Sequence, residues 1–84
     1  MIDLSKRKSN EKKYGAWEEL SNGHRRYFCE VKGHHGWKAH YVKEVDASER
    51  TLRFYQEIYN EHGELVEVHE KYPVDKGHSK VKED

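Results

Sequence analysis

The sequence is poor in the residues that support several common kinds of protein. Its 84 residues include one cysteine, one proline and one methionine, and 33% of them are apolar. A lone Cys29 forms no disulfide within the chain, so we expect no disulfide-stabilised fold. No apolar run approaches the roughly 20 residues of a membrane helix, and the N-terminus lacks the apolar segment of a signal peptide. We therefore expect a cytoplasmic protein that does not enter a membrane.

The chain also lacks an excess of charge of either sign. Sixteen basic and 16 acidic residues give a formal net charge of zero. A protein built mainly to coat nucleic acid shows a basic excess, so any such surface here must be local. Leucine is scarce, with four residues, whereas aromatic residues make up 12% of the chain. Since each aromatic ring buries about 150–250 Å², this composition favours a small sheet held by rings over a helical bundle.

Charged ends flank a central segment with the patterning of strands. Residues 1–14 carry five basic side chains against two acidic ones without apolar periodicity, which predicts a flexible basic arm. Residues 74–84 predict a flexible tail. Between them, residues 15–73 alternate extended segments with turn signals, and no segment has the apolar stripe of a packed helix. The predicted fold is all-β, a five-stranded antiparallel meander.

Turn signals set the predicted pairing of the strands. Asn22-Gly23 and His34-His35 are interpreted as two-residue turns, and Asp46–Glu49 as a four-residue turn. The predicted strands are residues 15–21, 24–32, 37–45, 50–60 and 64–72. These loop lengths bring one aromatic residue from each of the first four strands into a single row on one face: Trp17, Phe28, Tyr41 and Phe54.

The last hairpin leaves two registers open. A three-residue loop with Gly63 in the left-handed conformation would place Ile58 opposite Val66. A four-residue loop would instead place Arg53 opposite Glu70, which pairs opposite charges. The position of Gly63 favours the three-residue loop.

Both faces of the predicted sheet carry apolar residues. The second face includes Tyr27, Val31, Val42 and Tyr55. A flat sheet does not leave both faces half apolar in water. We therefore expect that the meander forms a curled sheet or a small barrel, or that a second copy covers one face in a homodimer.

The histidines and the cysteine raise the question of a metal or thiol site. The tip Gly33-His34-His35-Gly36 is interpreted as a polar turn. The predicted register places His40 opposite Cys29, which is half of a zinc site at most, because structural zinc takes four ligands. Cys29 lies in the middle of a strand on a half-apolar face, where a thiol is usually inert. We predict no metal site and no cofactor.

Three residues near the end of the chain are the candidate catalytic residues: His69, Glu70 and His78. Such groups deprotonate a 2′-hydroxyl and steady a phosphate in metal-independent ribonucleases. However, neighbours on a strand point to opposite faces, so His69 and Glu70 do not share a site unless a bulge intervenes. A protein without enzymatic activity is therefore favoured over an enzyme.

Basic and aromatic residues are interleaved on the second and third predicted strands. Arg26, Lys38, Trp37 and Tyr41 are the candidate binding residues. Small barrels bind single-stranded nucleic acid by stacking bases over a positive groove. In the alternative interpretation, the rings form the core and the charges pair with nearby glutamates. An RNA partner and a protein partner both stay open.

The run YVKEVDASERTLRFYQEIYNEHGELVEVHEKYPVDKGH resembles a family of small bacterial and archaeal proteins of unknown function, over about residues 14–81. That family implies no activity for particular residues. The order of Tyr59-Asn60, His69 and the closing run 77–81 is similar to the toxin half of certain small toxin–antitoxin pairs. Those toxins end in a richer histidine cluster, which this chain lacks.

Together these observations describe a small β-sheet binding or interaction module of unknown ligand. The toxin resemblance implies one alternative, a ribonuclease-like component of a toxin–antitoxin pair. The interleaved basic and aromatic residues indicate another, a small barrel that binds single-stranded nucleic acid.

Overall fold

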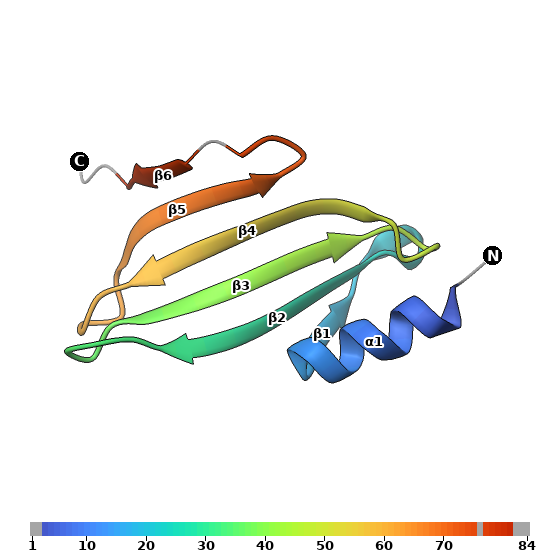
Figure 1. The fold of residues 1–84 in the computed structure, drawn as a ribbon, viewed down its shortest axis with the longest axis horizontal. Coiled ribbons are helices and arrows are strands. Elements are labelled where there is room, and N and C mark those ends of the chain that lie inside the picture. Colours follow the sequence, from blue (N-terminus) through green and yellow to red (C-terminus); the bar gives the residue numbers. More distant parts are fainter. Residues whose placement is uncertain (1–2, 76, 82–84) are drawn as a thin grey trace.

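The protein folds as one antiparallel sheet with a helix packed on part of one face (Figure 1). The structure is a computed structural model that describes residues 3–75 and 77–81. Strands β1 to β6 follow one another across the sheet in chain order. No helix in the described ranges is long and apolar enough to cross a membrane. The elements are α1 (Leu4–Tyr14), β1 (Ala16–Glu19), the 3₁₀ turn η1 (Ser21–Gly23), β2 (Arg25–Lys32), β3 (Lys38–Val45), β4 (Thr51–Tyr59), β5 (Leu65–Tyr72) and β6 (Gly77–Lys80).

The all-β meander is confirmed, although the sheet is open and does not close into a barrel. Five of the strands are those expected from the sequence. The sixth, β6, lies in the predicted flexible tail and pairs with β5 from Glu67↔Lys80 to Glu70↔Gly77. The flexible-tail prediction was therefore wrong for Gly77–Lys80, and its residues 76 and 82–84 lie outside the described residues.

The predicted flexible arm is instead helix α1, which corrects the assignment of residues 4–14. Asp3 caps the helix, because its carboxylate accepts a hydrogen bond from the Lys6 N–H at 3.0 Å. Gly15 ends the helix in the left-handed conformation, and its N–H donates to the Glu11 carbonyl. Only Asn10 and Tyr14 of the helix are buried. An apolar stripe could not reveal α1, because its contacts with the sheet are mainly polar.

All four hairpins between β1 and β5 have three-residue loops. In each, the backbone N–H before the loop donates to the carbonyl four residues later, at 2.8–3.0 Å. The third loop residue is always left-handed: Gly23, Gly36, Glu49 and Gly63. The three-residue loop at Gly63 is confirmed, whereas the first three predicted loop lengths were wrong by one residue.

This change in loop length moves residues between faces, because a one-residue slip inverts every side chain of a strand. Trp17 pairs with Tyr27 and not with Phe28, which pairs with Val42. The predicted row therefore breaks at Phe28, which points to the other side of the sheet. Its place is taken by Tyr27, whose ring lies 6.2 Å from that of Trp17.

In the last hairpin, Ile58 pairs with Glu67 and not with Val66, because the register shifts between Ile58 and Tyr59. Arg53 also reaches Glu70 and forms an ion pair with it. Neither predicted register is therefore observed, because Glu70 pairs with Tyr55 in the ladder and meets Arg53 only through its side chain.

The sheet has two unlike faces. The helix face is the one on which α1 packs, and it carries Trp17, Tyr27, Tyr41 and Phe54. The opposite face carries Phe28, Val42 and Tyr55 among paired charges. The core under α1 is small and consists of Tyr14, Tyr27 and Val45, with Cys29, Tyr41 and Phe54 packed against it.

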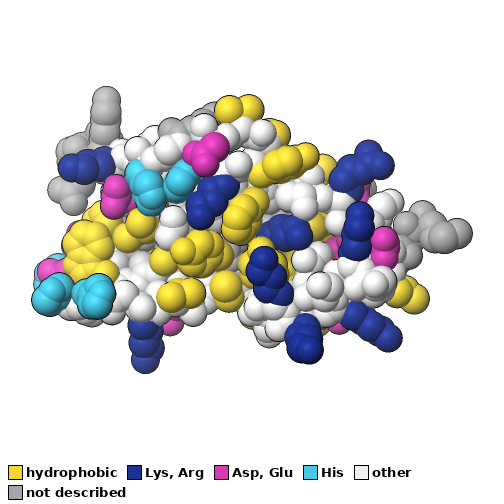
Figure 2. Space-filling view, viewed as in Figure 1, with side chains coloured by type: hydrophobic (Ala, Val, Ile, Leu, Met, Phe, Trp, Pro, Cys, Tyr) yellow, Lys and Arg dark blue, Asp and Glu magenta, His cyan; other side chains and the backbone are white. Residues whose placement is uncertain are grey.

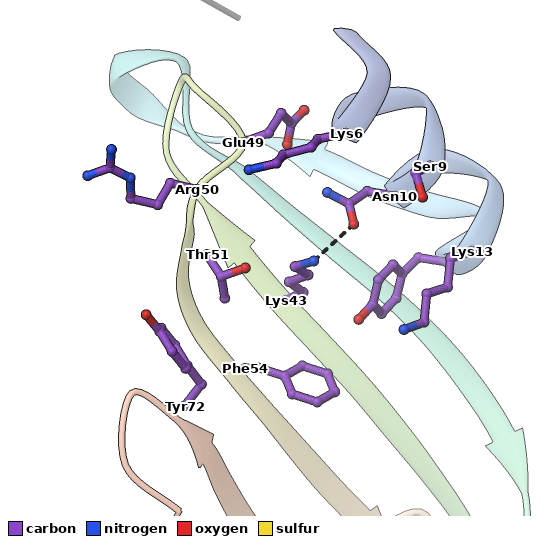
Figure 3. A pocket seen from close by; sticks show the side chains of 11 residues that line it. Lys6, Ser9, Asn10, Lys13, Lys43, Glu49, Arg50, Thr51, Phe54 and Tyr72 are labelled. Carbon is purple, nitrogen blue, oxygen red and sulfur yellow. Dashed lines mark hydrogen bonds between the residues drawn. The ribbon is translucent and has the colours of Figure 1, made fainter. Parts of the chain in front are cut away.

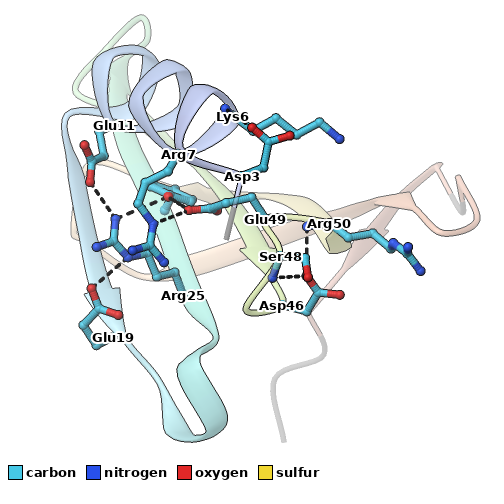
Figure 4. Close-up of polar contacts among 11 residues, drawn as sticks. Asp3, Lys6, Arg7, Glu11, Glu19, Arg25, Asp46, Ser48, Glu49 and Arg50 are labelled. Carbon is cyan, nitrogen blue, oxygen red and sulfur yellow. Dashed lines mark hydrogen bonds and ion pairs between the residues drawn. The ribbon is translucent and has the colours of Figure 1, made fainter. Parts of the chain in front are cut away.

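A buried carboxylate joins α1 to the sheet. The Glu49 side chain is fully buried in the turn after β3, and its Oε1 accepts hydrogen bonds from Tyr27 Oη at 2.7 Å and Arg7 Nε at 2.8 Å. Burial, and then the hydrogen bond to Glu49, raise the pKa of Tyr27. The phenol therefore stays protonated and donates a hydrogen bond to Glu49. We call Arg7, Tyr27 and Glu49 the Glu49 clamp. Figure 4 shows its contact between Arg7 and Glu49.

A second set of contacts runs alongside the Glu49 clamp. Arg25 contacts Glu11 of α1 at 2.7 Å and Glu19 of β1 at 2.7 Å, as Figure 4 shows. Its Nη1 also lies 3.4 Å from the Tyr27 hydroxyl. Hydrogen bonds to charged groups contribute about 1.5–3 kcal/mol when they are shielded from water. These polar contacts compensate for the missing apolar stripe of α1.

Substitution Glu49→Gly tests whether the clamp stabilises the fold. Glu49 has a φ of 66°, and removing its side chain relieves about 1–2 kcal/mol of left-handed strain. The loss of two charge-assisted hydrogen bonds outweighs this relief. We expect the free energy of unfolding in urea to fall by about 2–3 kcal/mol.

His35→Gly is the matched control, because His35 is exposed and left-handed with a φ of 57°. It removes strain without removing a buried contact, so stability should stay constant or rise by up to about 1 kcal/mol. An E49G variant that is more stable than the wild type by the full strain relief, about 1–2 kcal/mol, would show that the clamp contributes nothing.

Candidate anion-binding site

A pocket of about 610 Å³ lies between α1 and the strands β3 and β4 on the helix face (Figure 3). This volume is within the range of small-molecule sites, roughly 300–1,000 Å³. Helix α1 forms one wall through Lys6, Ser9, Asn10 and Lys13. The facing wall comes from Lys43 of β3, the turn that precedes β4, and the side chains of Phe54 and Tyr72.

Four basic side chains line this pocket, and we call Lys6, Lys13, Lys43 and Arg50 the basic pocket. Among the described residues, none of the four makes an ion pair with a carboxylate. The one acidic residue in the lining is Glu49, and its Oε1 is engaged by Arg7 and Tyr27. With four basic side chains against one carboxylate, the described lining carries an excess of positive charge.

Lys43 shows the electrostatic consequence of this arrangement. Its Nζ donates a hydrogen bond to Asn10 Oδ1 at 3.1 Å, drawn as the dashed line in Figure 3. Burial lowers the pKa of Lys43, the charges of Lys13 and Lys6 lower it further, and the charge of Glu49 opposes them in part. A bound anion would offset this repulsion between like charges. The pocket is thus electrostatically suited to a negatively charged ligand.

Aromatic rings continue the site along the helix face. Phe54 lines the pocket and stacks on Tyr41, with ring centroids 6.4 Å apart. The Lys71 ammonium lies 5.2 Å from the Tyr41 ring and 5.6 Å from the Phe54 ring. Figure 2 shows hydrophobic side chains across the middle of the molecule, with basic side chains and histidines beside them. A ligand that leaves the pocket along the sheet therefore meets both rings and charge.

Two of the predicted catalytic residues meet at the far end of this face. His69 of β5 pairs with His78 of β6, and their Nδ1 and Nε2 atoms are 3.1 Å apart. His69 Nε2 lies 2.6 Å from Asp75 Oδ1, which also accepts a hydrogen bond from the Gly77 N–H. Asp75 was not among the predicted site residues. Its position three residues before His78 in a short turn could have suggested the contact.

Glu70 does not join His69 and His78. It forms an ion pair with Arg53 of the neighbouring strand. Adjacent strand residues point to opposite faces, and the ladder shows no bulge between positions 69 and 70. His69 and Glu70 therefore point to opposite faces of the sheet, as the sequence predicted.

The predicted binding residues are divided between the two faces. Arg26 and Lys38 lie on the opposite face, where Arg26 pairs with Glu18 and Glu44, and Lys38 with Glu30. Tyr41 lies on the helix face. Trp37 lies at the end of the β2–β3 turn, and its indole N–H donates to Glu61. The structure does not bring these four residues into one surface.

Cys29 and His40 are not neighbours, which corrects the predicted register. Cys29 pairs with Tyr41, whereas His40 pairs with Glu30 and contacts its carboxylate at 2.9 Å. His34 and His35 lie at the hairpin tip with ring centroids 6.3 Å apart. Within residues 3–75 and 77–81, no group of three or more His, Cys, Asp or Glu side chains is arranged to hold a metal ion.

The residues of the basic pocket were missed because two of them lie in the predicted flexible arm. Lys6 and Lys13 are seven positions apart, which places them on the same side of a helix. Asp3 and Gly15 are an N-cap residue and a terminating glycine at a helical separation. These signals could have indicated the helix, and with it the cluster of lysines.

Comparison with known proteins leaves the geometry of the site as the guide to function. No protein-family model, curated protein or solved structure matches this chain.

Proposed function

We propose that this protein binds single-stranded nucleic acid on its helix face. The observation that carries the proposal is the basic pocket, whose four cations have no carboxylate partner among the described residues, next to exposed or half-buried rings. Phosphate is the anion that such a ligand supplies, and unstacked bases supply the flat apolar partners of the rings. A duplex offers no base faces to these rings.

The zero net charge of the chain is compatible with such a surface, because the charges are sorted by face. On the opposite face, Arg26 pairs with Glu18 and Glu44, and Arg53 pairs with Glu70. These pairs neutralise that side of the sheet. The lysines of the basic pocket have no such partners, so the positive potential is concentrated on the helix face.

The rings extend the interaction beyond a single phosphate. Tyr72 lines the pocket and is 47% exposed. Phe54 and Tyr41 follow along the sheet, with Lys71 above them. This alternation of cation and ring is typical of surfaces that bind several successive nucleotides without reading their sequence.

Removing two charges from the pocket should lower both the affinity and its salt dependence. The double substitution Lys6→Gln with Lys13→Gln keeps good helix formers in α1. In fluorescence anisotropy with labelled oligothymidylate at several salt concentrations, the slope of log K against log salt should shrink by about 1.4, since each lost phosphate contact contributes about 0.7.

The double substitution Lys8→Gln with Lys12→Gln is the matched control, because both lysines are exposed on the same helix and outside the pocket lining. It should keep the wild-type slope. Equal effects of the two double variants, or no binding by the wild type at low salt, would contradict the proposal.

Substitution Tyr72→Ala separates nucleic acid from other polyanions. Loss of one stacked base should weaken oligothymidylate binding by about 1–3 kcal/mol, or roughly 5- to 150-fold in Kd. Binding of inorganic polyphosphate, which has no bases, should stay within about twofold. Phe28→Ala is the control, since Phe28 is similarly exposed, at 39%, on the opposite face. If Y72A weakened both ligands equally, the site would bind charge alone, as an acidic protein partner would require.

A further inference from the structure

With both histidines neutral, the contacts around Asp75 assign the nitrogen of each ring that carries the proton. Hydrogen bonds from the Gly77 N–H and then from His69 lower the pKa of Asp75, so its side chain is a carboxylate that only accepts. His69 Nε2, 2.6 Å away, must therefore donate. A neutral imidazole has one N–H, so His69 Nδ1 is an acceptor. His78 Nε2 donates to it across 3.1 Å.

This chain of hydrogen bonds leaves His78 Nδ1 as an unprotonated nitrogen. The His78 side chain is 45% exposed, and its Nδ1 lies 4.0 Å from Glu67 Oε1. The His69 side chain, by contrast, is 16% exposed and has both nitrogens engaged. His78 is therefore the member of the chain that can take a proton from a ligand, and His69 and Asp75 orient it.

The nitrogen lies on the same face as the proposed binding surface. His69 pairs with Gln56, whose amide donates a hydrogen bond to the Tyr41 hydroxyl at 3.1 Å. Lys71 lies over Tyr41, and its charge also acts on Asp75. A nucleic-acid strand whose bases stack on Phe54 and Tyr41 thus continues toward Lys71 and His78. In Figure 2, histidine side chains lie beside basic and hydrophobic side chains on the surface.

We infer that His78 is the general base of an RNA-cleaving site, an inference that rests on the proposed binding of single strands to this face. His78 Nδ1 accepts the proton of a ribose 2′-hydroxyl as the 2′-oxygen attacks the adjacent phosphorus. A 2′-O–P bond forms and the P–O5′ bond breaks. The 5′-oxygen takes a proton from solvent, and His78 later returns its proton to solvent. The products are a 2′,3′-cyclic phosphate and a 5′-hydroxyl, and no co-reactant is consumed.

The other residues have defined parts in this reaction. Lys71 is the cation placed to neutralise charge on the phosphate. Asp75 and His69 are positioning residues, because they fix the proton arrangement of His78 without contacting the substrate. Glu70 has no part, since it pairs with Arg53 on the opposite face.

The test uses the full chain and two oligothymidylates, one all-DNA and one with a single ribonucleotide at its centre. Wild-type protein should bind both and cleave only the second, at the ribonucleotide, with a product of the mass of a cyclic phosphate. His78→Ala should lower the cleavage rate by about 10²–10⁴-fold, the usual contribution of a general base. It should change the Kd for the all-DNA strand by less than about twofold.

Two further variants separate chemistry from structure. His62→Ala removes another exposed histidine, at the β4–β5 turn, and should cleave like the wild type. Asp75→Asn should slow cleavage by about tenfold or more and move the pH–rate profile to lower pH, because the imidazolium loses a nearby negative charge. A purely structural role for Asp75 would not move that profile.

The outcomes distinguish this inference from the proposed function. Binding of the all-DNA strand without cleavage of the ribonucleotide by the wild type would overturn the cleavage site and leave the binding function intact. Cleavage that persists in the H78A variant would also overturn it. Failure to bind either strand at low salt would overturn both.

Discussion

The Glu49 carboxylate is the contact on which the rest of this small structure depends. It is fully buried between α1 and the sheet and accepts hydrogen bonds from Arg7 and Tyr27. A buried charge is costly unless it is paired and hydrogen-bonded, so the helix must stay in place to compensate for it. The left-handed backbone at Glu49 is a further cost. The third position of such a turn usually favours glycine. Here Glu49 occupies it, and its side chain reaches Arg7 of α1.

Placement of α1 also creates the binding surface. The helix contributes two of the four cations of the basic pocket, while the sheet contributes Lys43 and the rings. Burial and then repulsion from Lys13 and Lys6 lower the pKa of Lys43, so its charged form is disfavoured while the site is empty. The clamp therefore holds together charges that would otherwise separate, and a polyanionic ligand relieves their repulsion. At the other end of the same face, the β5–β6 pairing sets His69 against His78.

The sequence predicted five of the six strands, their order and the positions of the four turns between them, because these depend on local alternation and turn residues. It also predicted that His69 and Glu70 point apart. Loop length was harder to predict, since Asn22-Gly23 and Gly36 fit loops of two or three residues, and one residue moved Phe28 to the opposite face. Helix α1 was missed because its contacts are polar and come from residues distant in sequence. Local signals could place Lys6 and Lys13 on one side of a helix, but their convergence with Lys43 depends on that docking.

The most direct test of this account is hydrogen exchange of the amides in α1. An isolated 11-residue helix is marginal in water, so any strong protection of its amides must come from the clamp and the small core beneath it. The account predicts that the amides of residues 8–14 exchange only through global unfolding, with the same free energy of opening as those of β2 and β3. Exchange of these amides at the rate of an unstructured peptide, while β2 and β3 stay protected, would contradict it.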